Sequence, residues 1–91
     1  MTEIETLVEE VSRLYTELKR TGMRAMDALG VSDPDLVAGL LATHESRERA
    51  AGWLVRRMAP FGEFSALEML SQGEREAVMS VLHILQASQD E

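Results

Sequence analysis

The clearest feature of the sequence is a regular alternation of apolar and polar positions over its first 18 residues. Apolar side chains recur at steps of three and four residues, and mostly charged side chains fill the positions between them. This spacing places the apolar side chains on one face of an α-helix. The apolar positions are Ile4, Leu7, Val8, Val11, Leu14, Tyr15 and Leu18. The sequence therefore predicts an amphipathic first helix.

Two questions about this helix stay open on the sequence alone. The apolar spacing continues to Leu29, so the helix ends either near Gly22 or at Gly30, because glycine commonly follows the last turn of a helix. The apolar face either packs inside the chain's own bundle, which we favour, or forms one half of a coiled-coil dimer.

The middle of the sequence carries signals for two further helices. Ser32-Asp33-Pro34-Asp35 is a helix start, because a serine or aspartate side chain can accept from a free amide there and proline fits the first position. The second helix is predicted to follow this start and to end near Thr43-His44, and the third is predicted over residues 46–58. Trp53, on the third, is the expected anchor of the core.

Two capping boxes, Ser65–Glu68 and Ser71–Glu74, predict a brief fourth helix and a final fifth helix. The final helix is apolar on most sides, so we expect it to lie at the centre of the bundle or under a covering partner. No alternation typical of strands appears. The predicted fold is all-α: a single helical domain over residues 1–91, with about five helices, two of them short.

Composition narrows the class of protein. The 91 residues are 45 % hydrophobic and 27 % charged, which is typical of one globular domain. The absence of cysteine excludes disulfides and cysteine-based metal sites. No secretory signal or membrane-length apolar run occurs, so we expect a cytoplasmic protein that does not enter a membrane.

The sequence offers little for catalysis. His44 and Glu48 lie four residues apart, as in the first half of a zinc-binding helix, but the only other histidine, His83, falls in the apolar final helix. The serines lack the setting of an activated nucleophile, and no glycine-rich phosphate loop is present. We therefore expect a protein that is not an enzyme and that holds no metal or cofactor.

One segment is basic in a chain of net charge −7. Residues 45–58 hold four arginines and two glutamates, and residues 36–57 have the outline of a helix-turn-helix with residues 46–57 as the recognition helix. The negative total charge and the two glutamates oppose binding to DNA. We expect these arginines to contact acidic protein surface instead, either within this bundle or on a partner.

The second half resembles a known family. Ala50-Ala51-Gly52-Trp53-Leu54, then Ser65-Ala66-Leu67-Glu68-Met69-Leu70, then Gly73 with Val78, Leu82 and Ile84, are similar to successive parts of the toxin-binding domain of the Xre/MbcA/ParS antitoxins. The resemblance covers residues 50–85. The sequence departs from the family at Arg57-Met58, where Pro-Asn is expected, and at Ala66, where proline is expected. The resemblance implies a domain that binds and neutralises a toxin with a RES domain.

The residues and the resemblance together predict a non-catalytic protein–protein interaction module, an antitoxin-like inhibitor or regulator that is a homodimer and binds a partner protein. The alternative is a helix-turn-helix regulator that binds DNA. The residues expected to contact a partner are Arg47, Arg49, Arg56, Arg57, Met79, Leu82 and His83.

Overall fold

The computed structural model describes residues 2–89 and, in this range, a small all-α fold, which confirms the predicted fold class. Its helices are α1 (Glu3–Ser32), α2 (Pro34–Thr43), α3 (Arg47–Val55), α4 (Ala66–Ser71) and α5 (Arg75–Gln89). Between α3 and α4 lie two short strands, β1 (Arg57–Met58) and β2 (Phe64–Ser65), with a 3-10 turn (Ala59–Phe61) between them.

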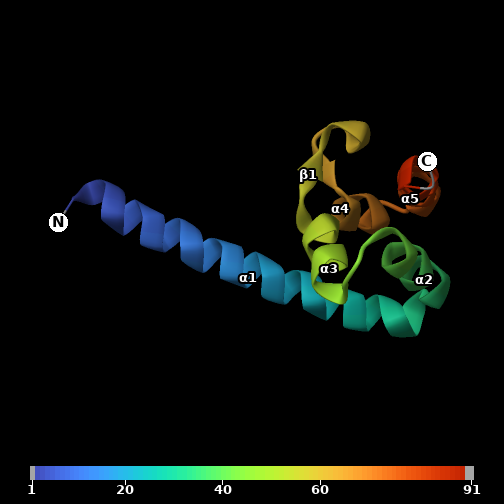
Figure 1. Ribbon diagram of the computed structural model, residues 1–91, viewed down its shortest axis with the longest axis horizontal. Coiled ribbons are helices and arrows are strands. Elements are labelled where there is room, and N and C mark those ends of the chain that lie inside the picture. Colours follow the sequence, from blue (N-terminus) through green and yellow to red (C-terminus); the bar gives the residue numbers. More distant parts are fainter. Residues whose placement is uncertain (1, 90–91) are drawn as a thin grey trace.

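Helix α1 gives the molecule an elongated shape. Its 30 residues correspond to about 45 Å of helix, close to the longest dimension of the molecule, 48 Å. The amino-terminal half of α1 projects away from the bundle formed by the other helices (Figure 1). The radius of gyration is accordingly 14.8 Å, whereas a compact domain of this length has about 12 Å.

Neither glycine ends α1. Gly22 and Gly30 both lie within the helix, and neither has the left-handed backbone that glycine adopts after a last turn. The helix ends at Ser32 because Pro34 disfavours helical backbone at the residue before it, and Asp33 is accordingly extended, with φ −152° and ψ 70°. Asp33 then caps α2, accepting from the Leu36 amide at 3.3 Å.

The carboxyl-terminal half of α1 packs on α3. Gly22 is buried at this crossing, and a Cβ built on it would lie 2.4 Å from the carbonyl oxygen of Ala51. The absence of a side chain therefore allows the two helix backbones to approach closely. Met26, one turn further along α1, is fully buried beside this contact.

The core lies between the carboxyl-terminal half of α1 and helices α2, α3, α4 and α5. Trp53 is 5 % exposed, which confirms it as a core residue, and its ring contacts those of Phe61 and His44 at centroid distances of 6.0 and 5.5 Å. The other core side chains are Met26, Leu36, Leu40, Ala50, Ala51, Leu54, Ala66, Val78 and Leu82.

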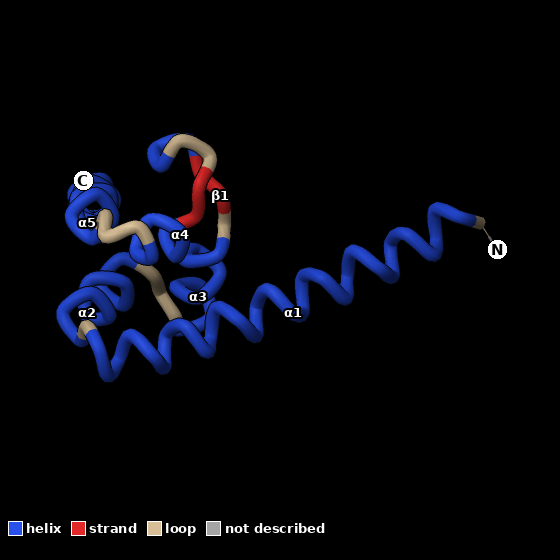
Figure 2. The backbone as a smooth tube through the Cα atoms, turned by 180° about the vertical axis from the view of Figure 1, so that it is seen from behind, coloured by secondary structure: helices blue, strands red, loops and turns tan. Residues whose placement is uncertain are grey.

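Helix α3 is shorter than predicted. It starts where expected, with Ser46 accepting from the Arg49 amide at 3.1 Å, but it ends at Val55 and not at Met58. Arg57 and Met58 instead pair with Ser65 and Phe64 in the small antiparallel hairpin, so the expectation that the chain has no strands is wrong. The hairpin lies on the side of the bundle away from α1 (Figure 2).

The two predicted capping boxes have different outcomes. The first is confirmed: Ser65 Oγ accepts from the Glu68 amide at 3.1 Å, and Glu68 Oε1 accepts from the Ser65 amide at 3.0 Å. The second is wrong, because Ser71 is the last residue of α4. Gly73, with φ +80°, ends that helix: its amide bonds to Leu70 O, and the next amide bonds to Met69 O, which is a Schellman motif.

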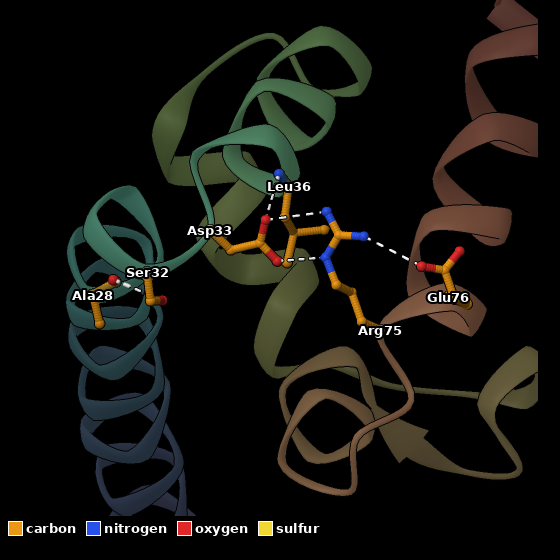
Figure 3. Close-up of polar contacts among 6 residues, drawn as sticks. All are labelled: Ala28, Ser32, Asp33, Leu36, Arg75 and Glu76. Atoms are coloured by element: carbon orange, nitrogen blue, oxygen red, sulfur yellow. Dashed lines mark hydrogen bonds and ion pairs between the residues drawn. The ribbon is translucent and has the colours of Figure 1, made fainter.

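Helix α5 lies at the edge of the bundle and not at its centre. It packs against α2 and α4 and buries Val78 and Leu82, whereas Ile84 is 65 % exposed. Its first residue, Arg75, donates from Nε to Asp33 Oδ2 at 2.6 Å and from Nη2 to Asp33 Oδ1 at 3.1 Å (Figure 3). This bidentate ion pair joins the start of α5 to the corner between α1 and α2.

The environment of Asp33 favours its charged form. The hydrogen bonds from Arg75 are the largest cause that lowers the pKa of this carboxyl, the Leu36 amide lowers it further, and partial burial opposes both. The same contact raises the pKa of Arg75, with Glu76 at 3.3 Å contributing (Figure 3). The corner between α1 and α2 therefore depends on an ionised carboxylate.

Candidate protein-interaction surface

A row of apolar side chains lies uncovered on the projecting half of α1. Each of the seven exposes between 46 and 68 % of its surface. They are Ile4, Leu7, Val8, Val11, Leu14, Tyr15 and Leu18, and are called the α1 stripe below. Contiguous apolar surface of this kind is typical of a site that another molecule covers.

The expectation that this stripe packs inside the chain's own bundle is wrong for residues 4–18. Only the continuation of the same face, at Gly22 and Met26, is buried within the molecule. The physical reason is length: α3, the main packing partner of α1, has nine residues and cannot cover a helix of 30. The same face of α1 is thus buried at Gly22 and Met26 and exposed over residues 4–18.

An open apolar pocket lies where the stripe meets the bundle. Tyr15 and Leu18 of α1 form one wall, and Gly52 and Val55 of α3 form the other. Charged side chains lie at its rim, with Lys19 paired to Glu48 at 3.2 Å and Arg56 at the end of α3. We call this the junction pocket. It extends the α1 stripe onto the bundle.

The four arginines expected to contact a partner are in different environments. Arg47 is paired with Asp27 of α1, and Arg57 lies 3.7 Å from Glu68. Within residues 2–89, the guanidinium groups of Arg49 and Arg56 have no ion-pair partner, and both are exposed. Only these two are left available on the surface of α3.

Arg49 and Arg56 border a second, more polar pocket with His44 and Trp53. His44 Nδ1 donates to the Leu40 carbonyl at 2.9 Å, and its ring packs on Trp53, so the side chain is held in place. Gly52 and Arg56 line both this pocket and the junction pocket. A basic surface therefore adjoins the apolar one.

The pairing of Arg57 with Glu68 belongs to the hairpin and not to the pockets. The Ser65 amide is the main cause that lowers the pKa of Glu68; the Ser65 hydroxyl and the charge of Arg57 lower it further, against desolvation. Arg57 therefore adds to the electrostatic stabilisation of the start of α4, a contact with acidic surface of its own bundle that was one of the two expectations for this arginine.

The residues of α5 that were predicted to contact a partner also differ in how far they are buried. Leu82 is fully buried, so it is a core residue and is not available to a partner. Met79 is half-buried and packs on the core, near Gly39 of α2. His83 is exposed. The structure does not bring these residues together with the arginines of α3.

The helix-turn-helix outline corresponds to α2 and α3, joined by residues 44–46. At the amino-terminal end of α3, where a recognition helix contacts bases, Arg47 is paired with Asp27 and Glu48 with Lys19, both of α1. The carboxyl-terminal half of α1 packs against α3 (Figure 2). The end of α3 that would enter a DNA groove is thus partly occupied by α1.

Within the described part of the chain, no group of three or more histidine, cysteine, aspartate or glutamate side chains has a geometry that could hold a metal ion. The helices in that part are also not long and apolar enough to cross a membrane. Against models of protein families, curated proteins and solved structures, the chain shows no match. The antitoxin resemblance of residues 50–85 rests on the residue pattern alone.

The junction pocket and the exposure of the α1 stripe were not predicted from the sequence. A signal was present in the sizes of the side chains. Large residues fill the apolar face up to Leu18, and small ones, Gly22 and Ala25, follow. Close approach to a short helix requires the small residues, so the change in size marks where internal packing begins.

Proposed function

We propose that the chain is a non-catalytic protein–protein interaction module that binds another polypeptide through the α1 stripe and the junction pocket. The observation that carries this proposal is that one helix face is buried against α3 at Gly22 and Met26 and uncovered over residues 4–18. Burial of apolar side chains supplies most of the free energy of association, and neighbouring charges guide the encounter.

The resemblance of residues 50–85 gives the proposal a specific form, an antitoxin-like inhibitor. These residues form α4, the hairpin and most of α3 and α5, so they make one contiguous part of the bundle away from the tip of α1 (Figure 1). In this form, the bundle contacts a toxin with a RES domain. Co-expression with such a toxin from the same host tests this form directly: growth restored by the chain supports it, and unrelieved toxicity refutes it.

The broader proposal is tested by photo-crosslinking in the native host. A photoreactive amino acid at the position of Leu14, on the stripe, should form crosslinks to a polypeptide. The matched control is the position of Thr16, which is exposed on the opposite face of the same helix. Crosslinking from position 14 and not from position 16 is the expected result.

Two outcomes would contradict the interaction module. Equal crosslinking from both positions would mean that α1 has no preferred contact face. The absence of crosslinks from position 14, in cells where the chain is abundant, would mean that nothing covers the stripe. The crosslinked species, identified by mass spectrometry, also separates a different protein from a second copy of the chain.

A further inference from the structure

The α1 stripe is symmetric about its own midpoint. It runs from Ile4 to Leu18, with Val11 at the centre, and spans about 21 Å of helix. If two such helices lie side by side in opposite directions about a two-fold axis at Val11, the whole stripe of one covers the whole stripe of the other. A closed, isologous contact of this kind is the commonest form of homodimer.

The charges beside the stripe favour the same arrangement. Residues 3–10 hold four glutamates and no basic residue, whereas residues 11–24 hold four basic residues and one glutamate. Antiparallel pairing places the acidic part of each helix opposite the more basic part of the other. Parallel pairing would place four glutamates opposite four glutamates, which is repulsive.

The junction pocket lies where the tip of a second α1 would arrive. With Val11 on the axis, Ile4 of the second copy reaches Leu18 and the apolar walls formed by Tyr15 and Val55. The first glutamates of the second copy then approach Lys19 and Arg56 at the rim, and Arg56 has no ion-pair partner among the described residues.

The position of the bundle also favours antiparallel over parallel pairing of two α1 helices. Beyond Leu18, the face of α1 is occupied by its own α3 at Gly22. Two parallel helices would bring two bundles to the same end and onto the same face. Two antiparallel helices place the bundles at opposite ends of the pair, because each bundle lies at the carboxyl-terminal end of its own α1 (Figure 1).

We infer that the partner of the α1 stripe is a second copy of this chain, bound antiparallel, with the tip of each α1 in the junction pocket of the other. This inference rests on the proposed function and names the polypeptide that covers the stripe. It leaves the α3–α5 part of each bundle available to other proteins at the two ends of the dimer.

Sedimentation equilibrium across the micromolar range tests the self-association. The wild type should approach twice the chain mass of 10.1 kDa. Val11→Glu should raise the dissociation constant by about 100-fold or more, because it places two carboxylates together on the apolar axis. Val11 is 46 % exposed in the single chain, so circular dichroism should show that the fold survives. Thr16→Glu, the same charge on the opposite face, should leave the dimer intact.

Disulfide trapping tests the direction, since the chain has no cysteine of its own. A mixture of an Ile4→Cys chain and a Leu18→Cys chain should form mixed disulfides between the two variants. Each variant alone should crosslink poorly. Efficient self-crosslinking of each variant alone would demonstrate parallel helices and overturn the inference.

The failure of this inference and that of the proposed function give different results. A monomer whose position 14 crosslinks to a different protein overturns the self-pairing and keeps the interaction module. A monomer with no crosslink from position 14 overturns both. Equal weakening of the dimer by Val11→Glu and Thr16→Glu also overturns the self-pairing. The dimer contact would then not lie on the α1 stripe.

Discussion

Gly22 and Ala51 meet where α1 crosses α3, and their contact sets the distance between the two helices. A Cβ at Gly22 would lie 2.4 Å from Ala51 O and 2.9 Å from Ala51 C, which are backbone atoms that cannot rotate away. Gly30, in the same helix, has no neighbouring atom within 4 Å of such a Cβ. One helix thus contains one glycine that packing requires and one that it does not.

Gly22→Ala should therefore destabilise the protein by about 1–3 kcal/mol, because the helices must separate, although alanine favours helix by about 1 kcal/mol. Gly30→Ala is the matched control and should stabilise by about 0.5–1 kcal/mol. Urea unfolding followed by circular dichroism measures both. An equal gain in stability from the two substitutions would show that α1 and α3 do not approach closely at Gly22.

Trp53 connects three parts of the core, since its ring contacts His44 after α2 and Phe61 in the 3-10 turn. Trp53→Ala should destabilise the fold by about 3–5 kcal/mol, enough to unfold much of a small domain. Tyr15→Ala, an aromatic residue that is 68 % exposed, should change the stability of the single chain little. Thermal unfolding of both variants is the measurement. Comparable melting temperatures would place Trp53 outside the core.

At the scale of elements, the corner between α1 and α2 is held by Asp33, which caps α2 and pairs with Arg75 of α5. Because folding lowers the pKa of Asp33, its stabilisation is fully present above the unfolded value of about 3.9 and is lost as the pH falls through the folded value. Asparagine at this position keeps the cap, because its amide oxygen also accepts from a backbone N–H, so substitution by asparagine removes the ion pair with Arg75 and not the cap.

Asp33→Asn should accordingly reduce stability at neutral pH, and the difference from the wild type should shrink as the pH falls from about 5 to about 2. Asp35→Asn removes an equal charge from an exposed side chain two residues away and serves as the control. Urea unfolding across this pH range gives both curves. A constant difference between Asp33→Asn and the wild type would exclude Asp33 as a source of acid sensitivity.

Local signals in the sequence predicted most of the elements correctly. The starts of α2, α3 and α4 follow from Asp33, Ser46 and Ser65, whose side chains bond to amides within three residues. The capping box predicted at Ser71 is wrong because Gly73 forms a competing local motif, the Schellman motif that ends α4. Single-sequence reasoning does not decide between two such motifs when they overlap.

The errors that remained were in non-local structure. Arg57 and Met58 continue a helical pattern and become a strand only because Phe64 and Ser65 pair with them, supported by the left-handed turn at Gly62. The bare state of the α1 stripe depends on how much surface the rest of the chain can cover. Neither property belongs to a short window of sequence. The apolar face of α1 was therefore predicted as a helix face and not as an exposed site, and of the residues expected to contact a partner only Arg56 lines the junction pocket.

On the scale of the whole molecule, charge argues against contact with nucleic acid. The chain carries −7, and of the four arginines near α3 two are already paired with carboxylates. A polyanion is repelled at long range by such a protein.

We expect no specific DNA binding by the wild type, and hence none to lose in an Arg56→Glu, Arg57→Glu double variant. Fluorescence anisotropy with host genomic fragments at about 0.1 M salt is the measurement. The double variant should instead be slightly less stable, since Arg57→Glu places a carboxylate near Glu68. Specific binding by the wild type that the double variant abolishes would establish the helix-turn-helix alternative.

The uncovered half of α1 also has a consequence for hydrogen exchange. A helix without tertiary contacts is only marginally stable in water, so backbone amides before Gly22 should exchange with solvent by local fraying, whereas those after it are protected by packing on α3. Helix α1 is thus one continuous helix whose two halves open as separate cooperative units. The boundary between them is Gly22, the glycine that contacts α3. Docking of any polypeptide on the stripe would join the two parts into one cooperative unit.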